Sequence, residues 1–392
     1  MRSFRVDIYL LKGARTPVGS FLGSMSQPSA VELGAHAIKH TLEKNGVEPK
    51  DIDEVFMGQV VQAGSGQAPA RQASLKAGLP NSVPCTTVNK VCGSGLKTII
   101  MAAQSIKAGD NRLCVAGGME SMSNAPHLIP NSRVGHKYGN FQTIDSMQND
   151  GLWDVYNDQP MGNCAEECVE KYSMSREELD TLAISSFKRS QKAQEDGVFK
   201  EEIAPFEIKN RKGSIIISED EGPKKAVFDK IPTLRPAFKK DGKVTAANSS
   251  TINDGAASII VGDESIKDKA NFKIVAYAGF AADPLWFTTA PVESAKRCLD
   301  KAGMNINDID LFEINEAFAA VALASIKELE LDKSKVNIYG SGISLGHPIG
   351  VSGTRIVMSL MTALERENKR FGMASICIGG GEALSMIVEK IK

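Results

Sequence analysis

The sequence predicts an α/β fold built from two similar halves, because two pairs of distant segments resemble each other. Residues 44–60 and 301–317 share Lys-x-Gly, a gap, and then Asp-Ile-Asp before an apolar run. Residues 113–123 and 376–386 share an apolar strand that ends in Cys-x-x-Gly-Gly. Strand patterns alternate with helical patterns in both halves, which is typical of packed α/β units.

Each half also carries a glycine-flanked polar residue immediately before a helical pattern. In the first half this residue is Cys92, in "VCGSGLKTI", and in the second half it is His347, in "SLGHPIGVSGTRI". Apolar residues recur at helix spacing after both: Leu96, Ile99, Ile100, Ala103 and Ile106, and Ile356, Val357, Leu360, Met361 and Leu364. Loops at corresponding strand ends converge where two such units meet, which favours a site built from both.

Cys92 is expected at or just before a helix N-terminus. Exposed backbone N–H groups favour an anion there, so we expect the pKa of this thiol to be lowered. The alternative is a buried structural cysteine beside a turn, since free cysteine is among the most buried residue types.

Residues 122–250 differ from the two halves, since they are polar and loop-like apart from a helix expected around 175–196. A mixed basic and acidic run follows over 209–225. Because long loops inside a compact protein are usually functional, we interpret the region as an insertion that covers a substrate. The expected domains are an N-terminal half of residues 1–121 plus 251–271, an inserted loop domain of 122–250 and a C-terminal half of 272–392.

The composition is that of an ordinary globular protein. A net charge of −1 without a basic arm argues against a nucleic-acid partner. No apolar run reaches the roughly 18 residues of a membrane span, and the first residues predict an early strand rather than a secretory signal. Seven irregularly spaced cysteines indicate reduced thiols in a cytoplasmic compartment. Cys164 and Cys168 lack the histidine partners of a zinc site, so no metal is expected.

Five motifs occur in order over essentially the whole chain: "VNKVCGSGLK", "GGMESMSNAPH", "NEAFAA", "GHPIGVSG" and "CIGGG". Together they resemble the thiolase family, and the detailed match is closest to its acetyl-CoA C-acetyltransferases. The resemblance implies a thiolase fold, in which two duplicated βαβαβαββ halves form a layered α/β/α/β/α core with an inserted loop domain. It implies a reversible Claisen condensation of two acetyl-CoA to acetoacetyl-CoA and CoA, through a ping-pong acyl-enzyme. Coenzyme A and acetyl-CoA would be substrates, with no tightly bound cofactor.

The same resemblance implies a role for each catalytic candidate. Cys92 matches the nucleophile that is acylated, and a thiolate suits exchange with a thioester. Cys377 matches the general acid/base. His347 matches the residue that activates Cys92 and donates toward the enolate oxygen, and Asn315 matches the residue that holds a water for that oxyanion hole. The backbone N–H groups of Cys92 and Gly379 would form a second hole.

Several candidates have a simpler interpretation when they are taken alone. His347 would be a turn histidine, Asn315 a cap or turn residue, and Cys377 an inert strand cysteine. Only their joint occurrence favours the catalytic interpretation. Cys85 and Cys114 lie on apolar stretches and are expected to be structural.

Positions that contact CoA also follow from the resemblance, with ordinary core packing as the alternative for each. These positions are Ser250, Ala246, Leu152, Met161, Phe238 and Phe318. Lys224 and Lys225 could meet the nucleotide phosphates, although a solvated loop is the simpler interpretation. The family forms dimers, often paired into tetramers with help from the inserted region, so a homo-oligomer is expected.

Two residues leave the acyl chain length open. Pro160 stands where acetoacetyl-CoA thiolases usually have His, which resembles the degradative 3-ketoacyl-CoA thiolases of fatty-acid β-oxidation. Phe287, in "LWFTTAPVE", falls in a region that lines the acyl pocket, where a bulky ring favours short acyl groups. A ketoacyl-synthase-like enzyme would share Cys92 and His347 but carry His or Asn at position 377. An acyl-CoA-binding protein without turnover would lack at least one of Cys92, His347 and Cys377.

Overall fold

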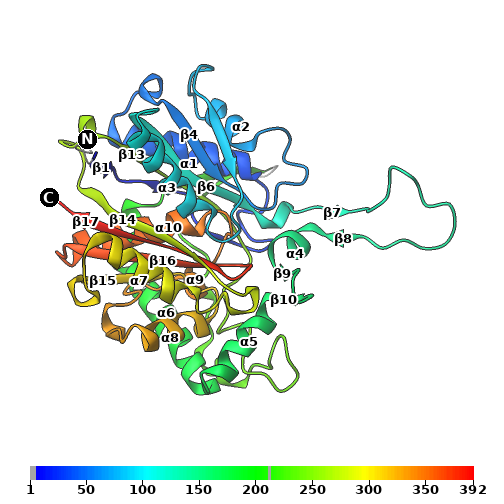
Figure 1. Ribbon diagram of the computed structural model, residues 1–392. Helices are drawn as coiled ribbons and strands as arrows, with labels where there is room; N and C mark the ends of the chain where they lie inside the picture. The colour runs from blue at the N-terminus through cyan, green and yellow to red at the C-terminus, as the bar shows by residue number, and fades with distance from the viewer. Residues whose placement is uncertain (1–5, 211–212) are drawn as a thin grey trace.

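The computed structural model describes residues 6–210 and 213–392, which form two similar halves and an insertion (Figure 1). The N-terminal half contains β1 (Ile8–Leu10), β2 (Ala14–Arg15), β3 (Gly19–Ser20), α1 (Ala30–Asn45), β4 (Glu54–Gly58), α2 (Pro69–Lys76), β5 (Cys85–Val88), α3 (Ser94–Ala108), β6 (Leu113–Ser121) and β13 (Asn253–Gly262). The C-terminal half contains β14 (Phe272–Ala281), α7 (Ala290–Ala302), β15 (Leu311–Ile314), α8 (Ala319–Glu328), α9 (Gly342–Leu345), α10 (Ser352–Arg366), β16 (Phe371–Ile378) and β17 (Glu382–Lys390). The start of the early strand expected from the first residues, 1–5, and residues 211–212 of the mixed charged run lie outside the described residues.

Matching contacts make the duplication visible. Helices α1 and α7 both end at a glycine in the left-handed region, Gly46 with a φ of 56° and Gly303 with a φ of 65°. The Asp-Ile-Asp motif that follows each helix leads into a strand, and its second aspartate ties that strand to its neighbour. Asp53 Oδ2 accepts the N–H of Leu113 at 2.8 Å, and Asp310 Oδ2 accepts the N–H of Phe371 at 2.9 Å.

Within the described residues, the strands of both halves join into one 11-stranded sheet with the order β15-β16-β17-β14-β1-β13-β6-β4-β5, where β2 and β3 pair with β13. The joint is β1, which pairs antiparallel with β13 on one side and with β14 on the other. Side chains alternate across the strands. In β1, Ile8 and Leu10 therefore face the central cluster, whereas Tyr9 faces the outer cluster of the N-terminal half.

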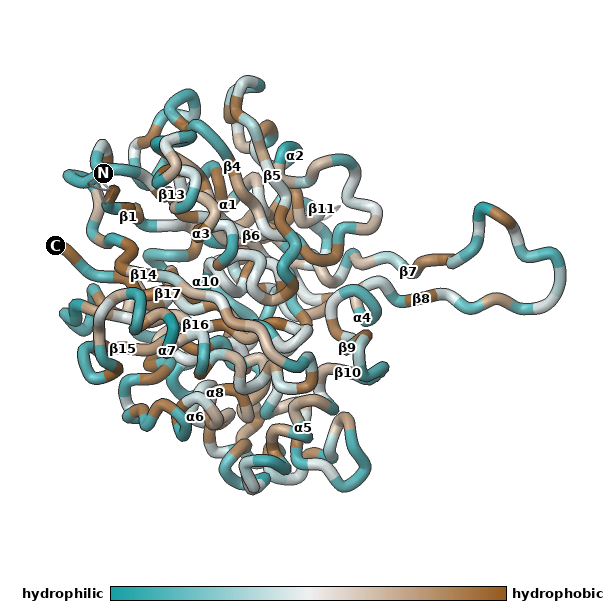
Figure 2. Tube along the Cα trace, in the orientation of Figure 1, coloured by the Kyte–Doolittle hydropathy of each residue, from teal (hydrophilic) through white to brown (hydrophobic). Residues whose placement is uncertain are grey.

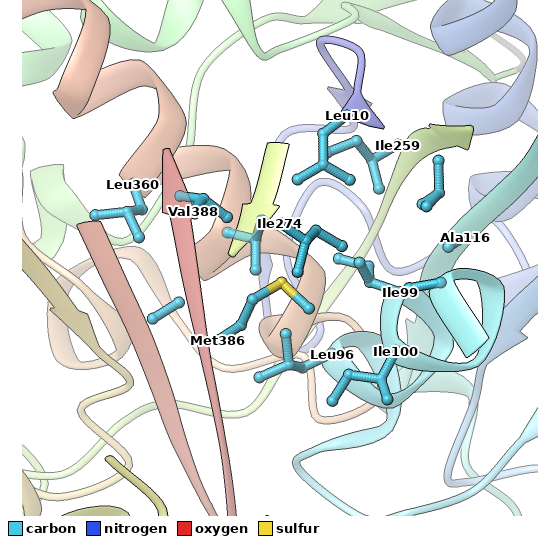
Figure 3. Packing of buried hydrophobic residues seen from close by; sticks show 14 of the residues in the cluster. Leu10, Leu96, Ile99, Ile100, Ala116, Ile259, Ile274, Leu360, Met386 and Val388 are labelled. Carbon is cyan, nitrogen blue, oxygen red and sulfur yellow. The ribbon is translucent and has the colours of Figure 1, made fainter. Parts of the chain in front are cut away.

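Helices α3 and α10 fill the central layer between the two halves of the sheet (Figures 1 and 3). They approach closely, since a Cβ on Gly353 would lie 2.3 Å from the backbone N of Leu96. Helices α1 and α2 cover the outer face of the N-terminal half, and α7 and α8 cover that of the C-terminal half. This order gives the expected α/β/α/β/α layering.

The halves differ at the third strand. The N-terminal half follows the expected βαβαβαββ order, with β5 as its third strand. In the C-terminal half only an isolated bridge between Phe312 and Val336 stands at that point. The chain then runs through α9 into the loop of His347.

The insertion contains β7 (His127–Leu128), β8 (Ile144–Asp145), α4 (Ser146–Gly151), β9 (Trp153–Asp154), β10 (Gln159–Pro160), α5 (Met161–Lys171), α6 (Arg176–Glu195), β11 (Phe206–Asn210) and β12 (Gly213–Ile217). The helix predicted around 175–196 is confirmed as α6, which starts at a capping box of Ser175 and Glu178. The β7–β8 hairpin projects far from the body, and hydrophobic residues lie along it (Figures 1 and 2). None of the helices in the described ranges has the length and apolar character that a membrane crossing requires.

Candidate active site

The loop before α3 holds Cys92 in a strained turn. Val91 has a φ of 46°, in the left-handed region that β-branched residues rarely adopt. Cys92 follows it directly and precedes Gly93, the N-cap of α3. The turn is closed by Lys90, whose N–H donates to Ser94 Oγ at 2.8 Å. Strain of about 1–3 kcal/mol is typical of such residues, and it persists only where neighbouring contacts maintain it.

The C-terminal half supplies some of those contacts. Gly93 meets Ile378 so closely that a Cβ on the glycine would lie 2.4 Å from Ile378 Cδ1. Lys90 Nζ forms an ion pair with Glu382 Oε2 at 2.5 Å. Cys92 therefore lies where the two halves meet.

The sulfur of Cys92 is crowded by protein and faces backbone amides. Burial raises the pKa of Cys92 to about 11, although the N–H groups of Gly379 and of Cys92 itself hydrogen-bond the sulfur and lower the pKa. The expectation of a lowered thiol pKa is therefore wrong, because the loss of water around the sulfur outweighs two amide dipoles. Thiolate formation here requires a proton acceptor close by.

Cys377 lies in β16, is 0 % exposed, and is near enough to Cys92 for the two thiols to interact electrostatically. Burial raises the pKa of Cys377 well above its ordinary value, and the charge of Cys92 raises it further. Because like charges at close range disfavour each other, one thiolate beside one thiol is the most negative state that this pair holds readily.

His347 lies in the loop between α9 and α10 and is fixed from both sides. Its backbone N–H donates to Asn253 Oδ1 at 2.9 Å, and its Nδ1 is 2.5 Å from Ser352 Oγ. The hydroxyl of Ser352 already donates to the carbonyl of Pro348 at 3.0 Å, so its oxygen accepts from Nδ1–H. This assigns the tautomer that carries a lone pair on Nε2.

The imidazole is held neutral. Burial, and then the charge of Arg355, lower the pKa of His347 to about 3. Its Nε2 is buried and has no hydrogen-bond partner among the described residues. A buried unpaired acceptor is costly, so its presence indicates a group that meets a ligand or a transferred proton.

Glu120, in β6, ties the histidine loop to the N-terminal half. Its carboxylate accepts the N–H groups of Val60 at 3.0 Å, Val61 at 3.1 Å and Gly350 at 2.8 Å. Burial raises the pKa of Glu120 to about 7, although the three amides lower it. Sequence reasoning misses this residue, although an acidic residue inside an apolar strand is a signal that could have found it.

Asn315 follows β15, and its side-chain amide points its nitrogen away from protein partners. Its backbone N–H donates to the carbonyl of Ser375 at 3.0 Å, and its Oδ1 accepts from Arg355 Nη2 at 3.3 Å. Its Nδ2 is buried without a partner among the described residues. His347 and Asn315 thus both carry a buried polar atom that is free to meet a ligand or a water, and Arg355 lies beside both.

Two of the predicted CoA positions lie against the loop that carries Cys92. Met161 approaches Gly379, since a Cβ on the glycine would lie 3.6 Å from Met161 Cε and 3.7 Å from Val91 Cγ1. Leu152 packs in the same small cluster as Cys92, and its carbonyl accepts the N–H of Met161 at 3.1 Å. Residues 152 and 161 therefore pack close to the loop that carries Cys92.

The other predicted CoA positions gather around an aromatic cluster. Phe318 makes edge contacts with Phe238 at 6.1 Å and with Phe287 at 6.2 Å between ring centroids. The N–H of Ser250 donates to the carbonyl of Ala317 at 2.9 Å, which ties its segment to this cluster. Ala246 precedes Ser250 on the same segment and is exposed.

The residues that bear on chain length and phosphate binding have distinct surroundings. Phe287 is buried against Phe318, and Pro160 is the N-cap of α5. Lys224 and Lys225 are exposed and already form ion pairs with acidic residues of their own segment.

A cavity of about 320 Å³ lies between α6 and α8 and is separate from the groups above. Leu182, Ala322 and Leu323 form apolar parts of its wall, and Arg189 and Glu316 are among its polar residues. None of the catalytic candidates lines it.

Of the remaining thiols, Cys168 also lies near enough to Cys377 to raise its pKa, and Cys164 Sγ donates to Asp154 Oδ2 at 3.3 Å. All seven cysteines are free, and Cys114, Cys164, Cys168 and Cys298 are buried while Cys85 is partly exposed. Within the described part of the chain, no group of three or more His, Cys, Asp or Glu side chains could hold a metal ion.

Comparison with known proteins gives one consistent family. The chain matches the family models described as "Thiolase, N-terminal domain" over residues 8–265 and "Thiolase, C-terminal domain" over residues 268–390. It is 46% identical over 391 residues to "Acetyl-CoA acetyltransferase" of Schizosaccharomyces pombe, which covers 98% of this chain and 99% of that protein. It is 48% identical to "Acetyl-CoA acetyltransferase, mitochondrial" of Rattus norvegicus, with 98% of this chain and 91% of that protein covered. A solved thiolase from Ascaris suum, in complex with coenzyme A, has a TM-score of 0.93 at 41% identity and covers 98% of this chain and 100% of its own.

Proposed function

The chain belongs to the thiolase family and is an acyltransferase, and on that premise we propose that it acts as an acetyl-CoA C-acetyltransferase. It condenses two acetyl-CoA to acetoacetyl-CoA and CoA, and the reaction is reversible. The observation that carries the proposal is the closeness of Cys92 and Cys377, which come from opposite halves of the chain. The free Nε2 of the His347 imidazole supports it.

In the first half-reaction Cys92 attacks the thioester carbonyl of acetyl-CoA. His347 Nε2 takes the thiol proton, which the neutral tautomer allows, and the N–H groups of Cys92 and Gly379 donate to the carbonyl oxygen as it becomes negative. The C–S bond of CoA breaks, and Cys377 protonates the departing sulfur. Cys92 is left acetylated and Cys377 is left as the thiolate.

In the second half-reaction the Cys377 thiolate removes a methyl proton from a second acetyl-CoA. This proton is very weakly acidic, so the enolate oxygen needs preorganised donors. His347, now protonated on Nε2, supplies one donor, and a water held by Asn315 Nδ2 supplies the other. The enolate carbon attacks the acetyl group, the bond to Cys92 sulfur breaks, and the proton returns from His347.

The CoA arm runs from the nucleophile loop, at Leu152 and Met161, past Phe238 and Phe318 toward Ser250 and Ala246 in this proposal. The packing of Leu152 and Met161 near the Cys92 loop supports this path, as does the edge contact between Phe238 and Phe318. CoA is a substrate here, and no tightly bound cofactor takes part. We propose that the chain divides into an N-terminal half of residues 1–121 plus 251–271, an inserted domain of 122–250 and a C-terminal half of 272–392. The inserted domain supplies most of the CoA-binding surface.

A preference for short acyl chains is part of the proposal, because the buried Phe287 ring fills space beside Phe318. The alternative is a degradative 3-ketoacyl-CoA thiolase with a longer-chain preference, to which Pro160 points. Rates of thiolysis with acetoacetyl-CoA and with a C8 3-ketoacyl-CoA test the choice. We expect kcat/KM to favour acetoacetyl-CoA by about tenfold or more, and the reverse order would favour the alternative. Phe287→Leu should move the ratio toward C8, whereas Phe371→Leu, at the far end of β16, should not.

We also propose a homotetramer built from dimers. The β7–β8 hairpin exposes apolar side chains that a partner could cover: Ile129, Val134, Tyr138, Phe141 and Ile144. Strand β5 ends the sheet with an open edge, which favours pairing with a second copy. Light scattering measures the mass directly, and a monomer at assay concentration would contradict it. The cytoplasmic compartment stays a prediction, since the Rattus norvegicus relative is named mitochondrial.

A further inference from the structure

We infer that Arg355 is a positioning residue for the condensation step, because it holds the Asn315 amide in the orientation that leaves its NH2 group free. The inference rests on the proposed function and adds to it a residue that the motifs do not single out. Arg355 is the fourth residue of α10 and is 0 % exposed.

The contact between the two side chains determines which way the amide faces. Arg355 Nη2 is 3.3 Å from Asn315 Oδ1. A guanidinium has five donors and no acceptor, so only the carbonyl end of an amide can face it. The NH2 end of Asn315 must then point the other way, where Nδ2 is buried without a partner in the described residues. A flipped amide would set N–H against N–H and could not donate to a water beside the enolate.

The arginine is itself held by a carboxyl on the same strand segment. Glu313 lies in β15, two residues before Asn315, which directly follows the strand, so the alternation of side chains places both on the same face. Glu313 Oε1 is 3.8 Å from Arg355 Nη1 and accepts the hydroxyl of Ser341 at 2.7 Å. Strand β15 and helix α10 are thereby registered to each other beside the site.

The hydrogen bonding of Arg355 is poor for a buried cation, which indicates a use other than stability. Its Nε and Nη1 have no hydrogen-bond partner in the described residues. Arg15 gives the contrast, since this buried arginine forms ion pairs with Glu202 at 2.9 Å and Asp220 at 2.8 Å. A buried charge that is incompletely paired lowers stability rather than raising it. Within the described residues, the one hydrogen bond of the Arg355 guanidinium is to the side chain proposed to hold the catalytic water.

The test separates the two half-reactions in purified full-length protein. Acetylation by acetyl-CoA is followed by intact mass in a quenched-flow experiment. Condensation and deuterium uptake into the acetyl-CoA methyl group, in D2O, report the enolate step. Arg355→Met should slow condensation and deuterium uptake together by about 10- to 100-fold, which is less than the about 10²–10³-fold loss that follows removal of an oxyanion donor, because the amide is misoriented rather than removed. Acetylation should change by less than about threefold. Arg355→Lys keeps a donor and should recover part of the loss, and it serves if Arg355→Met does not fold.

Lys97 provides the matched control. It is the fourth residue of α3, the helix that corresponds to α10, and Lys97→Met should leave both half-reactions unchanged. In an Asn315→Ala background, Arg355→Met should cause no further loss of condensation, because there is no amide left to orient.

Two results would overturn the inference: equal slowing of acetylation and condensation in Arg355→Met, or losses that multiply in the double variant. Either would assign Arg355 a general structural role. Failure of the wild-type protein to become acetylated would instead contradict the proposed function and is scored separately.

Discussion

The two halves of the molecule share a scaffold and differ at the ends of their elements. Asp53 and Asp310 make the same bonds, and α3 and α10 both begin with a serine whose hydroxyl bonds into the preceding loop. The N-terminal half presents one side chain that we propose to be catalytic, Cys92, on a strained turn. The C-terminal half presents His347, Asn315 and Cys377 from three separate elements. A duplicated fold can therefore present different side chains in its two halves when the differences are confined to the layer where the halves meet.

The largest effect is expected from the single group of the N-terminal half. Cys92→Ala removes the sulfur that accepts the acetyl group, so acetylation and turnover should both fall by at least about 10⁴-fold. Intact mass spectrometry after incubation with acetyl-CoA measures the label, and Cys85→Ala, on the neighbouring strand, is the control. An acetyl label that survives in Cys92→Ala would contradict the assignment.

The C-terminal thiol should fail differently, which is the sharpest way to distinguish the halves. Cys377→Ala should still allow acetylation by acetyl-CoA, whereas condensation should fall by about 10²–10⁴-fold for want of a base. The label should therefore accumulate on Cys92. The buried Cys298→Ala is the control, since no role in either step is proposed for it. If Cys377→Ala blocks acetylation as fully as Cys92→Ala does, the division of labour is wrong.

The sequence singles out those candidate residues that lie beside glycines at strand and helix junctions. Cys92 and His347 stand out there because a reactive side chain needs a backbone that leaves room for a ligand. Val91 carries no such signal, since a β-branched residue gives no hint of a left-handed conformation. Arg355 resembles any arginine in an amphipathic helix, and only the packed structure buries it.

The duplication of the fold was predictable from the sequence, whereas the connections between the repeated units were not. Helix periodicity and the paired Asp-Ile-Asp motifs report local structure, so they identify two α/β units. The union of both sheets through β1, the loss of the third strand to a bridge at Val336, and the projection of the β7–β8 hairpin depend on distant contacts. The pKa of Cys92 also depends on distant contacts, because burial among residues far apart in the sequence decides its direction.

Glu120 tests how strongly the N-terminal half holds the histidine loop of the other half. Burial raises its pKa from 4.5 to about 7, so the folded state binds its proton more tightly than the unfolded state. Its contribution to stability is complete below pH 4.5 and falls by about 3 kcal/mol as the pH rises to 7. Glu120→Gln should flatten the pH dependence of the unfolding free energy in this window.

Thermal unfolding at steps between pH 4.5 and 7 measures that slope. Glu48→Gln is the control and should leave the slope unchanged, because Glu48 is exposed and its side chain makes no cap hydrogen bond. If the Glu120→Gln protein has the same slope as the wild-type protein, burial does not raise the pKa of the Glu120 carboxyl as proposed.

The smallest effect tests whether the shared scaffold is equivalent in energy as well as in shape. Asp53 accepts the N–H groups of residues 112 and 113 at 2.7 and 2.8 Å, and Asp310 accepts those of 370 and 371 at 3.0 and 2.9 Å. Asp53→Ala and Asp310→Ala should each lower the unfolding free energy by about 1 kcal/mol, since each removes the same pair of bonds near the surface. Denaturant titration measures both, kcat should not change, and Asp51→Ala is the control beside the first site. If the two losses of unfolding free energy differ by more than their average, the two halves share this geometry but gain different amounts of stability from it. The half whose variant loses less unfolding free energy would then be the half whose strands are stabilised mainly by contacts with the other half.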